Sequence, residues 1–196
     1  MKKFILLTVT FLLFSVAHSQ EKKEIYFGIK GGLNLCSITN ADQDGVSSST
    51  LVGFHVGVLG EFMLGDNFAI QPELLYSTQG VKLEFDGDKG DLKMDYFTIP
   101  LMAKYYVVDA FSVELGPQIG FLTSAKATSG GESVDVKDSM KTTDFGLNFG
   151  VGYNITENFN MGLRYNLGLT QVQKDLVAGE SASKNSVFQI ALGYKL

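Results

Sequence analysis

The last ten residues of the chain, 187–196, alternate large apolar side chains with small or polar ones. The large members are Phe188, Ile190, Leu192, Tyr194 and Leu196. Successive side chains of a β-strand point to opposite faces, so this period of two places all of them on one face. The same pattern recurs back to Ile25. The chain is therefore expected to form many strands that share one continuous apolar face.

The N-terminus has the features of a secretory signal peptide. Lys2 and Lys3 form a positive start, residues 4–14 are mostly apolar, and Ala17-His18-Ser19 is a small-residue cleavage pattern. An uncleaved anchoring helix is the alternative, but a helix that crosses a bilayer needs roughly 18 or more apolar residues. We therefore expect residues 1–19 to be removed during export.

The mature chain would then be residues 20–196, which is enough for one domain. The formal net charge of −5 argues against a nucleic-acid partner, because such proteins carry a clustered basic face. Cys36 is the single cysteine, so no internal disulfide can form. No second apolar run is long enough for a transmembrane helix, so any membrane crossing must use strands.

Eight strands are predicted, and most exceed the five or six residues typical of soluble proteins. They suit a tilted crossing of the bilayer, which takes about 9–11 residues. The predicted ranges are Glu24–Leu35, Leu51–Leu64, Phe68–Phe85, Leu92–Val107, Phe111–Ala127, Thr142–Ile155, Phe159–Gln173 and Ser186–Leu196. The sequence thus indicates an all-β fold, an eight-stranded antiparallel transmembrane β-barrel.

The predicted connections alternate in length. Three are tight turns, at residues 65–67, 108–110 and 156–158, and four are longer polar stretches, at residues 36–50, 86–91, 128–141 and 174–185. Outer-membrane barrels have short periplasmic turns and longer extracellular loops. The spacing of about 45 residues between tight turns also suggests a propeller, but a blade needs four short strands per repeat rather than two long ones.

The two faces of the predicted strands differ in chemistry. The outward face is apolar and free of charge, as in Phe54, Val56 and Val58, whereas a soluble barrel would place these residues inside. Glycines and polar residues face inward, where the bore of an eight-stranded barrel is only wide enough for side chains. The inward polar set is Tyr26, Lys30, Asn34, His55, Glu61, Gln71, Glu73, Lys104, Tyr106, Glu114, Gln118, Asn148, Arg164, Asn166, Gln189 and Lys195.

Six inward charges form the main candidate site: Lys30, Lys104 and Arg164 against Glu61, Glu73 and Glu114. Buried charges have to be paired, because an unpaired one costs several kcal/mol. We expect an ion-pair network that plugs the lumen and fixes the strand register. A charged ion path or a latent gate is the functional alternative.

Other candidate residues give weaker signals. His55 is the only histidine of the mature chain, and Asp44 and Ser47–Ser49 precede it, but nothing in the sequence fixes the geometry of a hydrolase site. The acidic stretch 86–91 fails the EF-hand calcium template and is better explained as a hairpin tip. We predict no catalytic, cofactor-binding or metal-binding residues, and no cofactor.

Three prolines fall inside predicted strands, where proline removes a hydrogen bond of the ladder. Pro72, Pro100 and Pro117 are therefore expected to cause local bulges or shortened pairing.

Several segments resemble the PorT-like outer-membrane β-barrel family of Bacteroidetes-type bacteria. They are Gly28–Asn34, Gln71–Ser77 followed by Gly80, Tyr96–Tyr106, Gly116–Gly120 and Gly193–Lys195. The resemblance implies an eight-stranded barrel of the small OmpA or OmpX kind, in which the prolines are family features. It also implies a link to protein secretion, with which the namesake is associated. The chain departs from such barrels at Leu196, because they often end in an aromatic residue.

The sequence therefore predicts an exported outer-membrane barrel, monomeric and not an enzyme, with a structural, interaction or secretion-accessory role in the cell envelope. Its expected partners are outer-membrane lipid and proteins of the envelope or of the secretion machinery, and not nucleic acid. A small ion or solute channel is the first alternative. A lipid-acting enzyme with a site near His55 is the second.

Overall fold

The computed structural model describes residues 25–40, 46–85, 88–174 and 182–196. The predicted signal peptide, residues 1–19, lies outside these ranges. In the part that is described, no helix is long and apolar enough to cross a bilayer.

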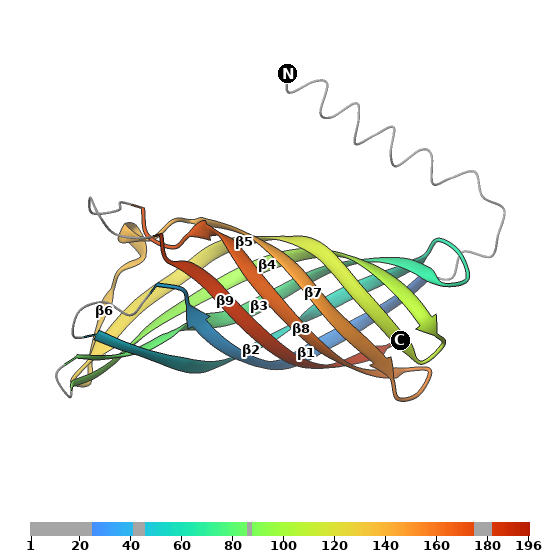
Figure 1. Ribbon diagram of the computed structural model, residues 1–196, viewed down its shortest axis with the longest axis horizontal. Helices are drawn as coiled ribbons and strands as arrows, with labels where there is room; N and C mark the ends of the chain where they lie inside the picture. The colour runs from blue at the N-terminus through green and yellow to red at the C-terminus, as the bar shows by residue number, and fades with distance from the viewer. Residues whose placement is uncertain (1–24, 41–45, 86–87, 175–181) are drawn as a thin grey trace, which may run out of the picture.

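Eight long antiparallel strands close into a ring (Figure 1). Each strand pairs with its neighbours along the chain, and the first strand pairs with the last. The ring consists of β1 (Ile25–Ile38), β2 (Val46–Met63), β3 (Phe68–Phe85), β4 (Asp88–Val108), β5 (Phe111–Ser129), β7 (Thr143–Asn154), β8 (Phe159–Gln171) and β9 (Lys184–Lys195). The predicted fold class is confirmed. A short extra strand, β6 (Glu132–Asp135), pairs with β5 outside the ring.

The β3–β4 connection differs from the sequence prediction. A long polar stretch was expected over residues 86–91, but the two strands pair out to Phe85 opposite Asp88. Lys82 lies opposite Asp91 and Glu84 opposite Lys89, and such cross-strand pairs of opposite charge support pairing. The paired strands agree with a hairpin tip, but Asp88 and Asp91 are residues of β4 rather than of a long loop.

The stretch 128–141 is also more ordered than predicted. It contains β6 and a single 3-10 turn, η2 (Lys137–Ser139). At this end of the barrel β2 to β6 continue past the rest of the ring, which is visible at the left of Figure 1. We call this projection, residues 46–50, 80–85, 88–94, 124–129 and 132–135, the outer sheet. The tight turns and the C-terminus lie at the opposite end.

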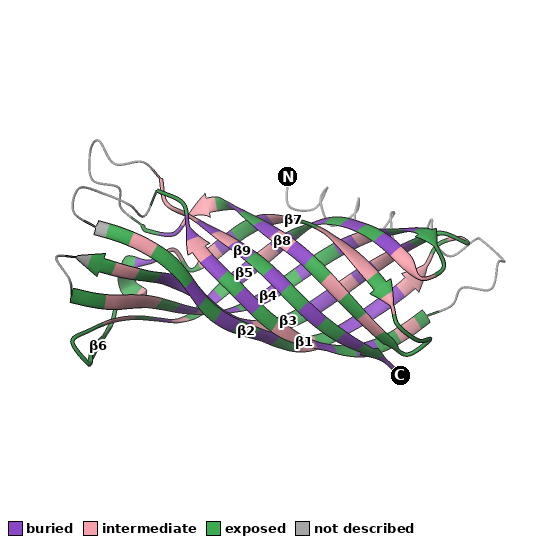
Figure 2. Cartoon of the chain, turned by 60° about the horizontal axis from the view of Figure 1, so that its bottom comes forward, coloured by how far each residue is buried: buried purple, intermediate pink, exposed green. Residues whose placement is uncertain are grey.

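The wall alternates buried and exposed residues along most of its length (Figure 2). On β4 the exterior side chains from Phe97 to Val107 are apolar. At about 3.3 Å per residue and a tilt of about 40°, this run covers about 25 Å of membrane thickness. That height equals the apolar band of known outer-membrane barrels. The prediction of an apolar, uncharged exterior is confirmed.

Aromatic pairs mark both edges of this band. Tyr76 contacts Phe54 and Phe97 near the outer sheet, with ring centroids 6.0 and 5.7 Å apart. Phe159 and Tyr194 contact each other at the end with the tight turns, with centroids 4.9 Å apart. Aromatic girdles are typical of the membrane interfaces of barrels.

The prolines shorten the pairing without shifting the strands. Around Pro72, the β2–β3 register passes from Leu59–Glu73 to Phe62–Ile70 without a change in offset. The register shifts lie elsewhere, for example between Thr50 and His55. A missing backbone N–H therefore removes hydrogen bonds at Pro72, while the sheet on both sides keeps its alignment.

Candidate functional site in the barrel interior

The six charged residues predicted for the lumen all point into the barrel and are buried. The structure joins them with a seventh, Lys195, into one group that we call the charge network. Its members are Lys30 on β1, Glu61 on β2, Glu73 on β3, Lys104 on β4, Glu114 on β5, Arg164 on β8 and Lys195 on β9.

Glu73 is the centre of the network. The Arg164 guanidinium donates to both of its carboxylate oxygens, at 2.9 and 2.8 Å. Lys30 Nζ lies 3.3 Å from Glu73 Oε1, and Gln71 Nε2 donates to the same oxygen at 2.6 Å. Arg164 also reaches Glu114 Oε2 at 3.2 Å. The paired geometry of Arg164 and Glu73 is the strongest form of such a contact, because both hydrogen bonds are charge-assisted.

Glu61 organises the part of the network nearer the tight turns. Its carboxylate accepts from Lys104 Nζ at 2.7 Å, from Lys195 Nζ at 2.6 Å and from the Tyr106 hydroxyl at 2.9 Å. Gln71 joins the two parts, since its Oε1 accepts from Lys104 at 3.1 Å while its Nε2 donates to Glu73. The bore is therefore crossed by one continuous chain of ion pairs and hydrogen bonds.

Glycine makes room for the largest of these side chains. Gly150 on β7 lies directly opposite Arg164 on one side and Glu114 on the other. A Cβ atom at Gly150 would overlap the carbonyl oxygen of Leu163 and would lie 3.1 Å from Glu114 Oε1. Seven strands thus supply charges, and the eighth supplies the space that they occupy.

The sequence prediction missed three members of this arrangement. Lys195, Gln71 and Tyr106 were expected to face inward but were not assigned to the network. The charges of the six selected residues balance, three cations against three carboxylates, so they give no reason to add Lys195. In the structure Glu61 accepts from two lysines, and the network holds four cations and three carboxylates.

A neutral polar layer lies next to the network, towards the outer sheet. The Asn34 amide nitrogen donates to the backbone oxygens of Phe54 and Thr78 and to the Ser77 hydroxyl. This fixes Asn34 Oδ1 as an acceptor, so His55 must donate to it through Nδ1, at 2.8 Å. The histidine is therefore held in one tautomer by the backbone of two strands.

The serines considered as partners of His55 lie at a different level of the β2–β3 ladder. Ser47, Ser48 and Ser49 are strand residues of β2 rather than loop residues. Asp44 lies outside the described residues. The β2–β3 register places Ser47 to Ser49 opposite residues 84 to 82, whereas His55 lies opposite Ser77, and the histidine is only 1% exposed.

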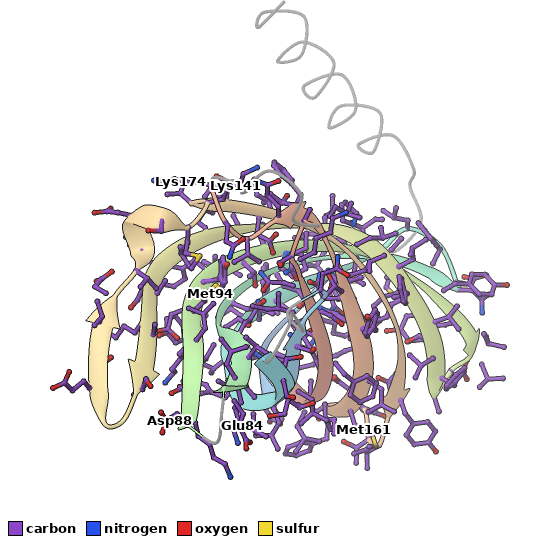
Figure 3. All side chains as sticks on the ribbon, turned by 60° about the vertical axis from the view of Figure 1, so that its left-hand side comes forward. Glu84, Asp88, Met94, Lys141, Met161 and Lys174 are labelled. Carbon is purple, nitrogen blue, oxygen red and sulfur yellow. The ribbon has the colours of Figure 1, made fainter. Side chains whose placement is uncertain are left out.

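Apolar side chains close the lumen at the end with the outer sheet. This apolar cap consists of Ile38, Val81, Met94, Tyr96, Leu122, Ala125, Met140 and Val172. Met140 is carried there by the segment after β6, which is fixed by hydrogen bonds from Val136 N to Ala125 O and from Lys141 N to Val172 O. Figure 3 looks towards this end, with Met94 and Lys141 labelled.

The opposite end of the lumen is open. A vestibule with a volume of about 430 Å³ lies inside the tight turns, and Glu61, Tyr106 and Lys195 form its floor. Each of the three turns contributes an acid to its lining, namely Asp66, Asp109 and Glu157. Within the described residues, no group of three or more histidines, cysteines or acids is arranged to hold a metal ion.

Comparison with solved structures shows the same fold. Ail, the attachment invasion locus protein of Yersinia pestis, aligns with a TM-score of 0.51 at 17% identity, over 88% of this chain and 99% of Ail. The complex of Ail with the heparin analogue sucrose octasulfate aligns over the same shares, with a TM-score of 0.51 at 15% identity. The outer membrane protein OprG of Pseudomonas aeruginosa aligns at 19% identity over 89% of this chain and 97% of OprG, with a TM-score of 0.48.

No curated protein matches the sequence. A sequence profile described as "Outer membrane protein beta-barrel domain" matches residues 17–174, which is more than half of the chain. The closed ring, the apolar exterior band and this match agree, and they place the protein in the outer membrane. The chain belongs to the family of the outer membrane protein beta-barrel domain.

Proposed function

We propose that this protein is a closed outer-membrane barrel that acts through its surfaces, in a structural or interaction role in the cell envelope. The observation that carries the proposal is the charge network, which crosses the bore and links seven of the eight strands. The apolar cap blocks the lumen a second time, near the outer sheet. Both barriers consist of side chains packed in the bore rather than a mobile plug.

Conductance tests this proposal directly. Purified protein in a planar bilayer should give no stable openings, because Glu73 and Arg164 fill the centre of the bore. A variant that weakens both barriers, Glu73→Ala with Arg164→Ala and Met140→Ala, should conduct more than the unmodified protein and serves as the comparison. Stable nanosiemens-scale openings from the unmodified protein would overturn the proposal.

A small ion or solute channel is the second candidate, and the vestibule favours it. The vestibule carries water-accessible space from the tight turns to Lys195 and Glu61, so only part of the lumen would have to open. Small, brief openings that disappear when Glu61 is replaced would support this candidate.

The finer assignment is to a PorT-like protein with an accessory role in secretion. Its support is the sequence resemblance, whose segments Gly28–Asn34, Gln71–Ser77 and Tyr96–Tyr106 lie on β1, β3 and β4. Deletion of the gene, followed by comparison of the secreted proteins, tests this role. Unchanged secretion would leave a structural role.

Export and maturation complete the proposal. We expect cleavage before Gln20, which N-terminal sequencing of the outer-membrane protein would show. The unboiled protein should migrate as a compact monomer that heating converts to a slower species. We assign no enzymatic role, because His55 is buried and bonded to Asn34, so His55→Ala should leave the lipid composition of the membrane the same as with the unmodified protein.

A further inference from the structure

Two lysines lie side by side on the exterior of the barrel, just beyond its outer aromatic edge. Lys93 on β4 is directly opposite Lys126 on β5, and both are exposed. Opposite residues of an antiparallel pair have Cβ atoms about 4.5–5.5 Å apart, and like charges at this position are destabilising. The sheet would be more stable with a neutral residue at either position, unless an anion binds between them.

The surrounding carboxylates offset this pair only in part, because none of them forms a close ion pair with it. Lys82 lies on the neighbouring strand β3, opposite Asp91. Asp135 on β6 is opposite Lys126. Asp95, two residues from Lys93, is half-buried and accepts from the Thr78 hydroxyl at 2.9 Å. Among the described residues, the structure gives neither Lys93 nor Lys126 a carboxylate within ion-pair distance.

The depth of the pair corresponds to lipid headgroups. Phe97 lies opposite Phe121 at the edge of the apolar band, and Lys93 is four residues further along β4. That separation is about 13 Å of strand, or about 10 Å along the membrane normal at a tilt of about 40°. A lysine stem can extend back along apolar surface while its ammonium stays in the polar layer. Both ammonium groups can therefore reach the level at which lipid phosphates lie.

The wall leaves this position open. The neighbour of Lys93 on β3 is Gly80, which has no side chain to cover it. Gly80 has a φ of +143°, and a Cβ atom there would overlap the carbonyl oxygen of Leu92, so a larger residue is strained at this position.

We propose that Lys93 and Lys126, with Lys82 beside them, form a site for the phosphate group of an outer-leaflet glycolipid. The phosphate lies between the two ammonium groups and removes their mutual repulsion, and the acyl chains run down the apolar wall beside Phe97 and Phe121. The proposal therefore selects one class, phosphorylated glycolipids, from the outer-membrane lipids expected as partners. It rests on the outer-membrane placement of the barrel and not on whether the lumen conducts.

The test compares Lys93→Gln with Lys126→Gln against Lys89→Gln, all as folded barrels in detergent. Lys89 is the matched control, because it is an exposed lysine on the same strand and lies opposite Glu84. The probes are bis-phosphorylated lipid A, its dephosphorylated form and inorganic phosphate. Bound lipid is measured by native mass spectrometry, and stability by the temperature at which the compact species is converted.

The double variant should bind phosphorylated lipid A about thirty-fold more weakly than the unmodified protein, with about five-fold for each lysine, and Lys89→Gln should bind it normally. Without lipid, the unmodified protein should have no stability advantage over the double variant, because removing a lysine relieves the repulsion between the two ammonium groups. The double variant should then convert at the same or a higher temperature than the unmodified protein.

Three results would overturn the assignment. The first is equal binding of phosphorylated lipid A by the double variant and the unmodified protein. The second is equal binding of the dephosphorylated lipid. The third is displacement of the lipid by millimolar inorganic phosphate, which would make the pair a site for free anions. None of these results affects the closed-barrel proposal, which conductance tests separately.

Discussion

The lumen is blocked at two levels by opposite chemistry. Towards the tight turns the bore is filled by the charge network, in which side chains from seven strands pair with one another. Towards the outer sheet it is filled by the apolar cap, which resembles the core of a soluble protein. The network depends on pairing, whereas the cap depends on volume. The two regions should therefore respond differently to substitution.

Glu73→Gln should have the largest effect. It leaves Arg164 with Glu114 as its carboxylate partner and removes the ion pair that the structure gives Lys30, and breaking a buried pair costs about 3–5 kcal/mol. Urea unfolding in lipid vesicles, followed by gel migration, would measure the loss. Glu84→Gln, the same substitution on the exposed part of β3, should change the free energy of unfolding by less than about 1 kcal/mol. If Glu73→Gln also changed the free energy of unfolding by less than about 1 kcal/mol, water in the bore would be replacing the ion pairs of Glu73.

Met140→Ala should have a smaller effect, of about 2 kcal/mol. Met140 is 8% exposed at the edge of the apolar cap, so the segment that carries it can partly collapse into the space left behind. The same unfolding assay applies. Met161→Ala, on the lipid-facing wall, is the control and should cost less, because lipid fills the gap. If both variants lost the same amount, the cap would not behave as a packed core.

Lys89→Gln should change stability by less than about 1 kcal/mol, because its partner Glu84 is exposed and lies across a water-facing part of the sheet. A larger loss would show that charges on the outer sheet contribute to the fold as much as those in the lumen do.

The coupling between network and cap should be the smallest effect. The double variant Glu73→Gln with Met140→Ala should lose the sum of the two single losses to within about 0.5 kcal/mol, since the residues share no partner. A double-mutant cycle measures the difference. A coupling above about 1 kcal/mol would mean that the two barriers form one cooperative unit.

The same contrast explains how far the sequence could predict the structure. In the wall each residue faces either lipid or lumen, so the period of two identified the exterior and the inward charges, including Lys30 and Arg164. The partners were less predictable, because they depend on the shear of the ring. Arg164 reaches Glu73, 91 positions away in the chain, and Lys195 reaches Glu61, 134 positions away.

The cap could not be predicted by that rule. Met140 and Val172 enter the lumen from connections between strands, where no alternation fixes the direction of a side chain. The length of the β3–β4 hairpin is also underestimated from the sequence, because β4 begins at Asp88 rather than at Leu92 and its first residues, Asp88, Lys89 and Asp91, are charged. The cross-strand order of these charges was the available signal.

The spread of the charge network over the chain has a consequence for biogenesis. Its carboxylates on β3 and β5 find Arg164 only after β8 has been synthesised and brought round the circle. A half-formed sheet that entered the bilayer earlier would expose uncompensated ions to hydrocarbon, at a cost of several kcal/mol each. The charges of the network are therefore paired only when the ring of strands closes. This favours insertion of the whole barrel in one late, cooperative step.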